Sequence, residues 1–210
     1  GRVNSTFSRY SRVRSMTGMT GAEAARRLLN AQGIYDVTVQ QIAGELTDHY
    51  DPRTKTVNLS QSVYGATSVA AIGVAAHECG HAMQDNEGYA PLRFRSALVP
   101  VANFGSSLSW PLILLGLVFG GLGSPLVEIG ILMFSLAVLF QLVTLPVEYN
   151  ASARAVRLLD AQGILAGEEV NGTRKVLNAA ALTYVAAAAT SILQLLRLII
   201  LFGGRNRRDR

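Results

Sequence analysis

Residues 77–81 read His77-Glu78-Cys79-Gly80-His81, and an apolar run rich in small residues leads into them from Ser68. The run predicts a mostly buried helix, on which residues four positions apart share one face. Both imidazoles can therefore reach the same metal ion, and neutral imidazole nitrogen suits zinc. Glu78 lies one step around the helix, where it can take a proton from water without binding the ion. This stretch predicts two metal ligands and a general base.

An ordinary helix with two exposed or capped histidines is the alternative interpretation of this stretch. The chain has only three histidines, and two of them lie in these five residues. A buried His-Glu-His group without a metal would leave polar atoms unpaired, at a cost of several kcal/mol. We therefore favour the metal site. Cys79 lies between the histidines, facing away from the shared side, and is expected to be a packed, inert thiol.

The composition predicts a membrane protein. Half of the 210 residues are hydrophobic, and 16% are charged, against about 25% in typical soluble domains. The net charge of +5 comes almost wholly from arginines that flank apolar stretches. This pattern favours an anionic lipid bilayer as partner, and no motif indicates nucleic-acid binding.

Two apolar segments predict a transmembrane helical hairpin. Residues 97–121 and 126–147 are each long enough to cross a bilayer, and Gly-Leu-Gly-Ser-Pro at 121–125 is typical of a tight turn. A buried hairpin in a soluble core is the alternative, which two adjacent runs of this length disfavour. A third apolar run, residues 178–203, contains Gln194 and Arg197 and is expected either to span or to lie partly against the other helices.

Local patterns predict a mainly α fold with a small β element. A capping-box pattern begins a helix at Thr20, residues 35–42 and 55–60 favour strands, and residues 48–54 favour a turn. The expected organisation has five segments: a juxtamembrane arm and catalytic segment (1–96), the transmembrane hairpin (97–147), third-ligand and amphipathic helices (148–177), an apolar helix expected to be transmembrane (178–203) and a basic tail (204–210).

A hydrolytic zinc site needs a third protein ligand. The candidates are His49, Asp85, Glu87, Glu148 and Asp160. Glu148 is at the foot of the second predicted span, and the hairpin returns it to the membrane face that carries the histidines. The position of Glu148 alone supports two roles about equally: a metal ligand, or a carboxylate that lies at a membrane interface.

The basic residues predict the orientation in the membrane. Most of them lie on the same side as the histidines, which predicts that this side is cytoplasmic. The tail at 205–210 conflicts with this orientation if the last apolar run spans the membrane.

The stretches Val74-Ala-Ala-His-Glu-Cys-Gly-His-Ala-Met-Gln84 and Leu145-Pro-Val-Glu-Tyr-Asn-Ala-Ser-Ala-Arg-Ala155 resemble the YugP-type membrane zinc metallopeptidases of bacteria. The likeness covers essentially the whole chain, and the chain is more distantly similar to the HtpX and CAAX-protease group of gluzincins. The resemblance implies an integral-membrane, zincin-like fold, one Zn²⁺ per chain and Glu148 as the third ligand. It also implies a further transmembrane helix upstream of residue 1.

Two residues depart from the pattern of these families. Family members often carry an acidic residue where Asn150 stands, so the charge beside the metal is expected to be lower here. The distant group carries an Asp at the place of Ser152, where it orients a ligand histidine, and Ser152 would be a weaker partner.

The zincin resemblance also implies a substrate-binding strand upstream of the histidine box. Residues 56–60, with Val57, Asn58 and Leu59 at their centre, are expected to form an edge strand that pairs with an extended peptide. His49, Tyr50, Tyr149 or Tyr184 could stabilise the tetrahedral intermediate, with packing in turns as the alternative for each.

These features together predict a multi-pass enzyme of the bacterial cell membrane. We expect a zinc endopeptidase that hydrolyses peptides or membrane proteins near the cytoplasmic surface, with His77, His81 and Glu148 on the metal and Glu78 as catalytic base. The alternative is a zinc-stabilised membrane scaffold without hydrolytic activity. The sequence leaves the oligomeric state open.

Overall fold

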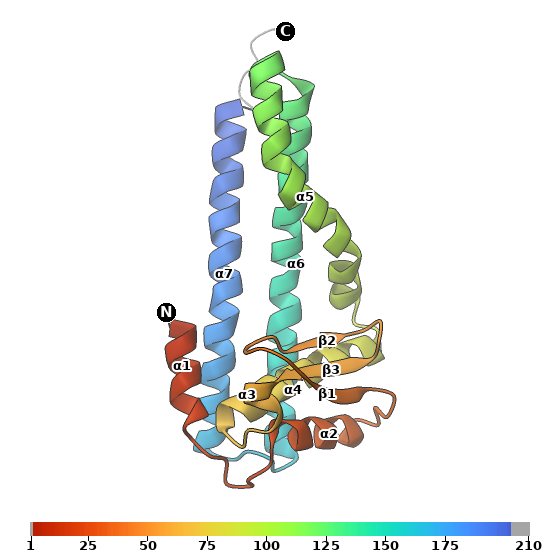
Figure 1. Ribbon diagram of the computed structural model, residues 1–210, viewed down its shortest axis with the longest axis vertical. Helices are drawn as coiled ribbons and strands as arrows, with labels where there is room; N and C mark the ends of the chain where they lie inside the picture. The colour runs from red at the N-terminus through yellow and green to blue at the C-terminus, as the bar shows by residue number, and fades with distance from the viewer. Residues whose placement is uncertain (1, 203–210) are drawn as a thin grey trace. The chain divides into compact units, whose positions relative to one another are not determined.

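The structure, a computed structural model, describes residues 2–202 and is mostly helical with one small sheet (Figure 1). The predicted basic tail lies outside the described residues. The elements in chain order are α1 (Arg2–Ser11), α2 (Gly21–Ala31), β1 (Thr38–Ile42), β2 (His49–Asp51), β3 (Thr56–Ser60), α3 (Gln61–Tyr64), α4 (Val69–Glu87), α5 (Ala90–Gly120), α6 (Pro125–Ala161) and α7 (Glu168–Phe202).

The chain divides into two compact units, which we describe separately. The first comprises Gly1–Leu92 and Pro146–Thr183, and the second comprises Arg93–Leu145 and Tyr184–Arg210. Helices α6 and α7 are each continuous, and each of them contributes residues to both units. The five-segment division of the chain stays a prediction.

Helix α4 is the centre of the first unit. Most of its residues are buried, because alanines and glycines let α2, the sheet and α6 approach its backbone. Ser68 caps its start through a hydrogen bond from the Ala71 N–H, and Gly88 ends it in the left-handed conformation, at φ 68°. The predicted buried helix is therefore present, with both ends defined by ordinary caps.

The sheet corrects the expectation for residues 56–60. The strand order is β1-β3-β2, so β3 pairs with β1 in parallel and with β2 antiparallel. Both backbone edges of β3 are occupied, and a peptide cannot add to it as it would to an edge strand. The edges of the sheet are β1 and β2. Segment 48–54, predicted as a turn, contributes β2, and the turn itself is confined to the residues that follow Asp51.

The N-terminal arm contains helix α1, an element that the sequence analysis did not predict. Its polar sequence has no extended apolar period, and one of its packing contacts is made by an aromatic residue. The Tyr10 ring packs against Gly172 of α7, where a Cβ would lie 2.6 Å from the ring. A contact that depends on a glycine 162 positions away in the sequence cannot be recognised from local pattern.

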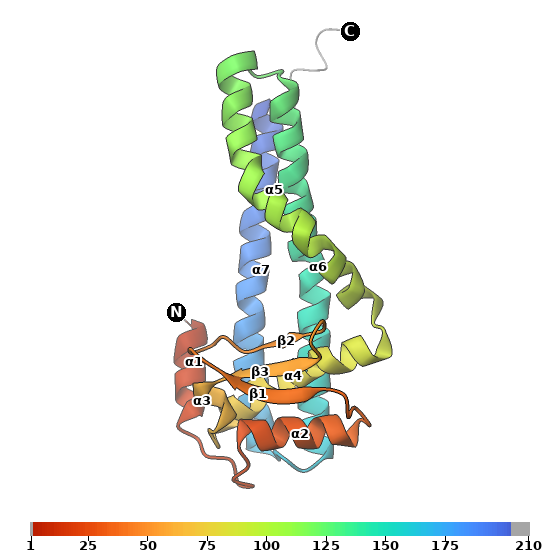
Figure 2. The ribbon, with the colours of Figure 1, turned by 45° about the vertical axis from the view of Figure 1, so that its right-hand side comes forward.

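The second unit contains the hairpin of α5 and the first part of α6 (Figure 2). Its two helices approach closely at glycines: a Cβ at Gly105 would lie 2.5 Å from the Met133 carbonyl oxygen, and one at Gly130 would lie 2.9 Å from the Ser109 carbonyl oxygen. Small residues at such contacts are typical of packing between membrane helices.

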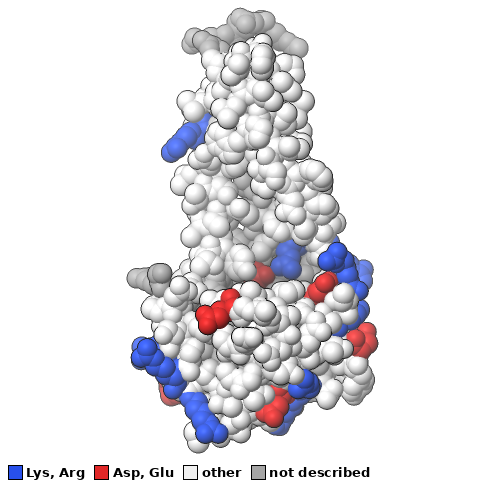
Figure 3. Space-filling view, viewed as in Figure 1, with Lys and Arg blue, Asp and Glu red and all other residues white. Residues whose placement is uncertain are grey.

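Helices α5, α6 and α7 are each long and apolar enough to cross a membrane. Many of their large hydrophobic side chains are exposed, as expected for surfaces that face lipid. On the face drawn in Figure 3, charged side chains gather over the sheet and the short helices, and the apolar parts of the long helices show almost none. These features support location in a membrane.

Candidate metal centre

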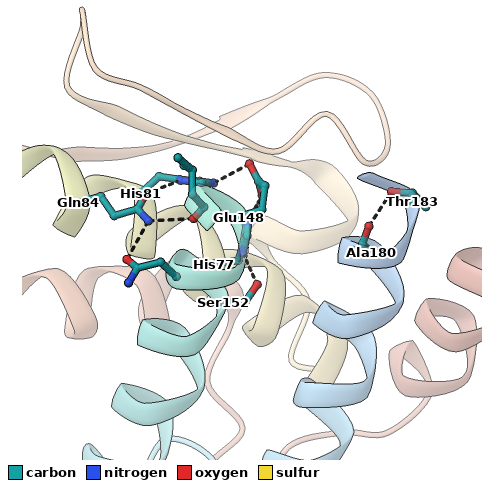
Figure 4. A network of polar contacts seen from close by, with 9 residues as sticks. His77, His81, Gln84, Glu148, Ser152, Ala180 and Thr183 are labelled. Carbon is teal, nitrogen blue, oxygen red and sulfur yellow. Dashed lines mark hydrogen bonds and ion pairs between the residues drawn. The ribbon is translucent and has the colours of Figure 1, made fainter. Parts of the chain in front are cut away.

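Helices α4 and α6 bring His77, His81 and Glu148 together (Figure 4). One ligand atom from each residue lies within 4.8 Å of the others. The two carboxylate oxygens of Glu148 face the two histidines separately, with Oε2 2.9 Å from His77 Nε2 and Oε1 3.4 Å from His81 Nε2. Within residues 2–202, these three side chains form a group whose geometry could hold a metal ion.

Gly80 explains how the two helices come close enough for this arrangement. It lies between the two histidines in sequence, on the part of α4 that faces α6. A Cβ added at Gly80 would lie 2.5 Å from the carbonyl oxygen of Ala151, a distance that packed side chains do not tolerate. The absence of a side chain therefore lets the backbone of α4 contact α6 one turn from Glu148.

The second nitrogen of each imidazole has its own partner. His77 Nδ1 lies 3.0 Å from the Ser152 hydroxyl, and His81 Nδ1 lies 3.0 Å from Oε1 of Gln84. Gln84 is fully buried, and its Nε2 donates to the carbonyl oxygen of Val147 and to Oδ1 of Asn150, both at 2.9 Å. These contacts connect the histidines to α6 on both sides of Glu148.

The Gln84 contacts determine the tautomer of His81. The carbonyl oxygen of Val147 can only accept, so the NH₂ group of Gln84 must face it. The amide oxygen then faces His81 Nδ1, which must carry the proton as donor. In the neutral ring this leaves a lone pair on His81 Nε2, the atom that points at Glu148.

This donor set fits zinc. Two imidazole nitrogens and one carboxylate are a known ligand combination for hydrolytic zinc, and hydrogen bonds to the outer nitrogens of ligand histidines are typical of such sites. All three side chains are buried or half-buried, which limits competition from bulk water. The residues that the sequence analysis assigned to the metal thus lie where an ion could contact all of them.

Glu78 and Cys79 occupy different environments on α4. Glu78 is 8% exposed and makes no hydrogen bond or ion pair within the described part of the chain. A buried carboxylate of this kind is typical of a functional group rather than of a structural one. Cys79 is buried and lies 3.6 Å from the Ala25 carbonyl oxygen. Burial, and then the charge of Glu78, raise the pKa of the Cys79 thiol. The burial confirms a packed side chain, and its lack of reactivity stays a prediction.

The other candidates for the third ligand lie elsewhere. Asp85 accepts a 2.7 Å hydrogen bond from the Tyr50 hydroxyl and forms an ion pair with Lys55 at 3.2 Å. Glu87 pairs with Arg154 at 2.7 Å. Asp160 and His49 are exposed, and neither belongs to the metal-ligating group.

Most of the residues that were expected to bind substrate are buried or committed to other contacts. Val57 and Leu59 are fully buried in the core, and Asn58 is buried and contacts His49, because β3 is the central strand. Tyr50 is committed to Asp85, and its pKa is raised by burial and then by that hydrogen bond. Tyr149 is exposed, and it lines a surface cavity together with Ser152. Tyr149 and His49 stay predictions.

Asn150 connects Gln84 to a cluster that the sequence analysis did not identify. Its Oδ1 accepts from Gln84 and, at 2.7 Å, from Arg154, whose guanidinium also pairs with Glu87. Gln84 itself was missed. Its position three residues after His81 places both side chains on one face of a helix, and this spacing was the signal that could have found it.

Comparison with known proteins gives two matches. The sequence pattern of a family described as "Putative neutral zinc metallopeptidase" matches residues 1–203. A curated protein of Bacillus subtilis (strain 168), described as "Putative membrane protease YugP", is 50% identical over 201 residues, which are 96% of this chain and 88% of that protein. No solved structure matches the chain, and the zincin-like fold stays a prediction.

Proposed function

The chain belongs to the family described as "Putative neutral zinc metallopeptidase", and we propose that it is a membrane-embedded zinc endopeptidase. The observation that carries this proposal is the convergence of His77, His81 and Glu148 from two helices far apart in sequence. Its substrates are membrane proteins or peptides, cleaved near the cytoplasmic membrane surface. Three candidate spans in the same chain support this substrate class.

In this mechanism His77, His81 and Glu148 would hold one zinc ion. Zinc bound there supplies Lewis acidity toward the peptide carbonyl and the attacking water. Glu78 accepts the proton of that water and later donates it to the leaving amine. Ser152 and Gln84 orient the two imidazoles through their outer nitrogens, and burial of the group keeps competing water out.

A Glu78→Gln variant tests the proposal. The amide has the same shape but cannot accept the proton, so hydrolysis of casein in detergent should fall by roughly 10²-fold or more. Zinc content should stay equal to that of the parent, because Glu78 is not a ligand. Glu45→Gln is the matched control, since Glu45 is exposed and belongs to no polar contact of the site, and its activity should be unchanged.

Undiminished cleavage by Glu78→Gln with normal zinc would exclude the peptidase mechanism. Cleavage that is absent from the parent as well, with zinc present, would favour the second reading, a zinc-stabilised membrane scaffold. In that case the three ligands would serve to hold α4 against α6.

A further inference from the structure

A cavity of about 550 Å³ lies between α1 and the first half of α7. Figures 1 and 2 both show α1 alongside the start of α7. The two helices make close contact where the Tyr10 ring packs on Gly172. The cavity follows one turn further along α7, and its lining reaches Leu182. It does not include any residue of the metal centre.

The lining of this cavity is positively charged. Arg9 and Lys175 contribute to it, and no acidic side chain does. Neither cation forms an ion pair with a residue that the structure describes, and the guanidinium carbon of Arg9 lies 5.7 Å from the centroid of the Tyr10 ring. Thr6 and Asn178 add a hydroxyl and an amide. Two cations without counter-charges, together with neutral donors, suit an anion with several acceptor oxygens.

The position of the cavity along α7 suggests which anion this is. Residues 182–202 of this candidate span cover about 30 Å, roughly the thickness of the hydrocarbon core. Leu182 would then lie at the edge of the hydrocarbon. Lys175, seven residues earlier, would lie about 10 Å further out, at the depth of lipid headgroups. The lining changes in the same direction, from Lys175 through Ala179 to Leu182.

A second cavity, of about 350 Å³, shares Asn178 with the first. It contains Arg157 and Arg174, again without an acidic side chain, and extends to Ser152. Four cations therefore line two adjoining cavities.

We propose that the cavity between α1 and α7 binds the headgroup phosphate of an anionic phospholipid. Arg9 and Lys175 contact the phosphate, and Ala179 and Leu182 contact the glycerol and the first methylenes of the acyl chains. This site is separate from the proposed peptidase centre and goes beyond the general attraction of basic residues to a membrane, because it is one cavity of defined lining.

Native mass spectrometry of the full chain in maltoside detergent tests the proposal. The probes are short-chain phosphatidylglycerol and phosphatidylcholine, which share the phosphate but differ in net charge. We expect one phosphatidylglycerol to bind in preference to phosphatidylcholine. Arg9→Gln and Lys175→Gln should each weaken it about fivefold. Arg53→Gln, which removes the same charge from a side chain that is 88% exposed, should leave its affinity unchanged.

Three results would overturn the assignment. Equal binding of the two lipids would remove the role of charge, and an equal loss in Arg53→Gln would indicate unspecific attraction. Displacement of phosphatidylglycerol by an equal concentration of inorganic phosphate would indicate a site for soluble phosphate. Thermal unfolding of each variant checks that it is folded, and Lys175→Gln alone decides the outcome if Arg9→Gln disturbs α1.

Discussion

His77 and His81 depend on neighbours that hold their rings in place. Each outer nitrogen has a partner at 3.0 Å, Ser152 for His77 and Gln84 for His81. The Gln84 amide is the more constrained of the two, because it also donates to two acceptors on α6. A residue of this kind acts on the metal only through the ligand that it orients.

Replacement of Gln84 by Met should therefore weaken zinc binding. The thioether fills similar space but cannot accept from His81 Nδ1 or donate to the Val147 carbonyl, so we expect a loss of about 10- to 100-fold in affinity. Competition with a chromophoric chelator measures it. Gln61→Met, at an exposed position, is the control. Equal zinc affinity in both variants would show that the Gln84 contacts have no role in metal binding.

The identity of the candidate metal-binding pair could be predicted from the sequence, and the contacts around it could not. The spacing of His77 and His81 is a local helical property. Position in the chain left Glu148 as one of five candidates for the third ligand, and the family resemblance singled it out. The contact between Gln84 and the Val147 carbonyl joins two helices through a main-chain atom, which no side-chain pattern records.

At the level of elements, the close crossing of α4 and α6 positions the site. It occurs at Gly80, where a Cβ would overlap with the Ala151 carbonyl oxygen. The sheet shows a feature that local sequence patterns do not determine. The sequence pattern predicted strands in the regions of β1 and β3. It did not predict their order in the sheet, because that order depends on the parallel pairing of β1 with β3, and β2 separates these two strands in the chain.

A Gly80→Ala substitution should separate the two helices. Overpacking of this kind costs roughly 1–3 kcal/mol, and it should lower both the unfolding temperature and the zinc affinity. Gly65→Ala is a suitable control, because a Cβ there meets nothing within 4 Å and the backbone φ is −97°. Thermal unfolding with and without added zinc gives the comparison. Indistinguishable unfolding temperatures for the two variants would show that the crossing at Gly80 is not tight.

At the scale of the whole molecule, the three apolar helices and the charged first unit suggest a fixed orientation in the membrane. The predicted spans were recognised from length and composition alone, because a bilayer imposes the same requirement on every helix that crosses it. The side on which the metal centre lies stays a prediction from the distribution of arginines and lysines.

Labelling with a membrane-impermeant maleimide tests this orientation. Cys79 is buried and its thiol pKa is raised, so the parent should react little. We expect Gly123→Cys, in the exposed turn between α5 and α6, to be labelled in cells whose outer layers have been removed. Arg53→Cys should be labelled only after the membrane is permeabilised. The reverse pattern would place the metal centre outside.

Zinc analysis of the purified chain beside its Glu148→Ala variant tests the metal centre most directly. We predict about one zinc per chain in the parent, a strong loss in Glu148→Ala and full retention in Glu87→Ala, whose carboxylate pairs with Arg154 instead. Full zinc content in Glu148→Ala would contradict a site closed by the carboxylate of α6.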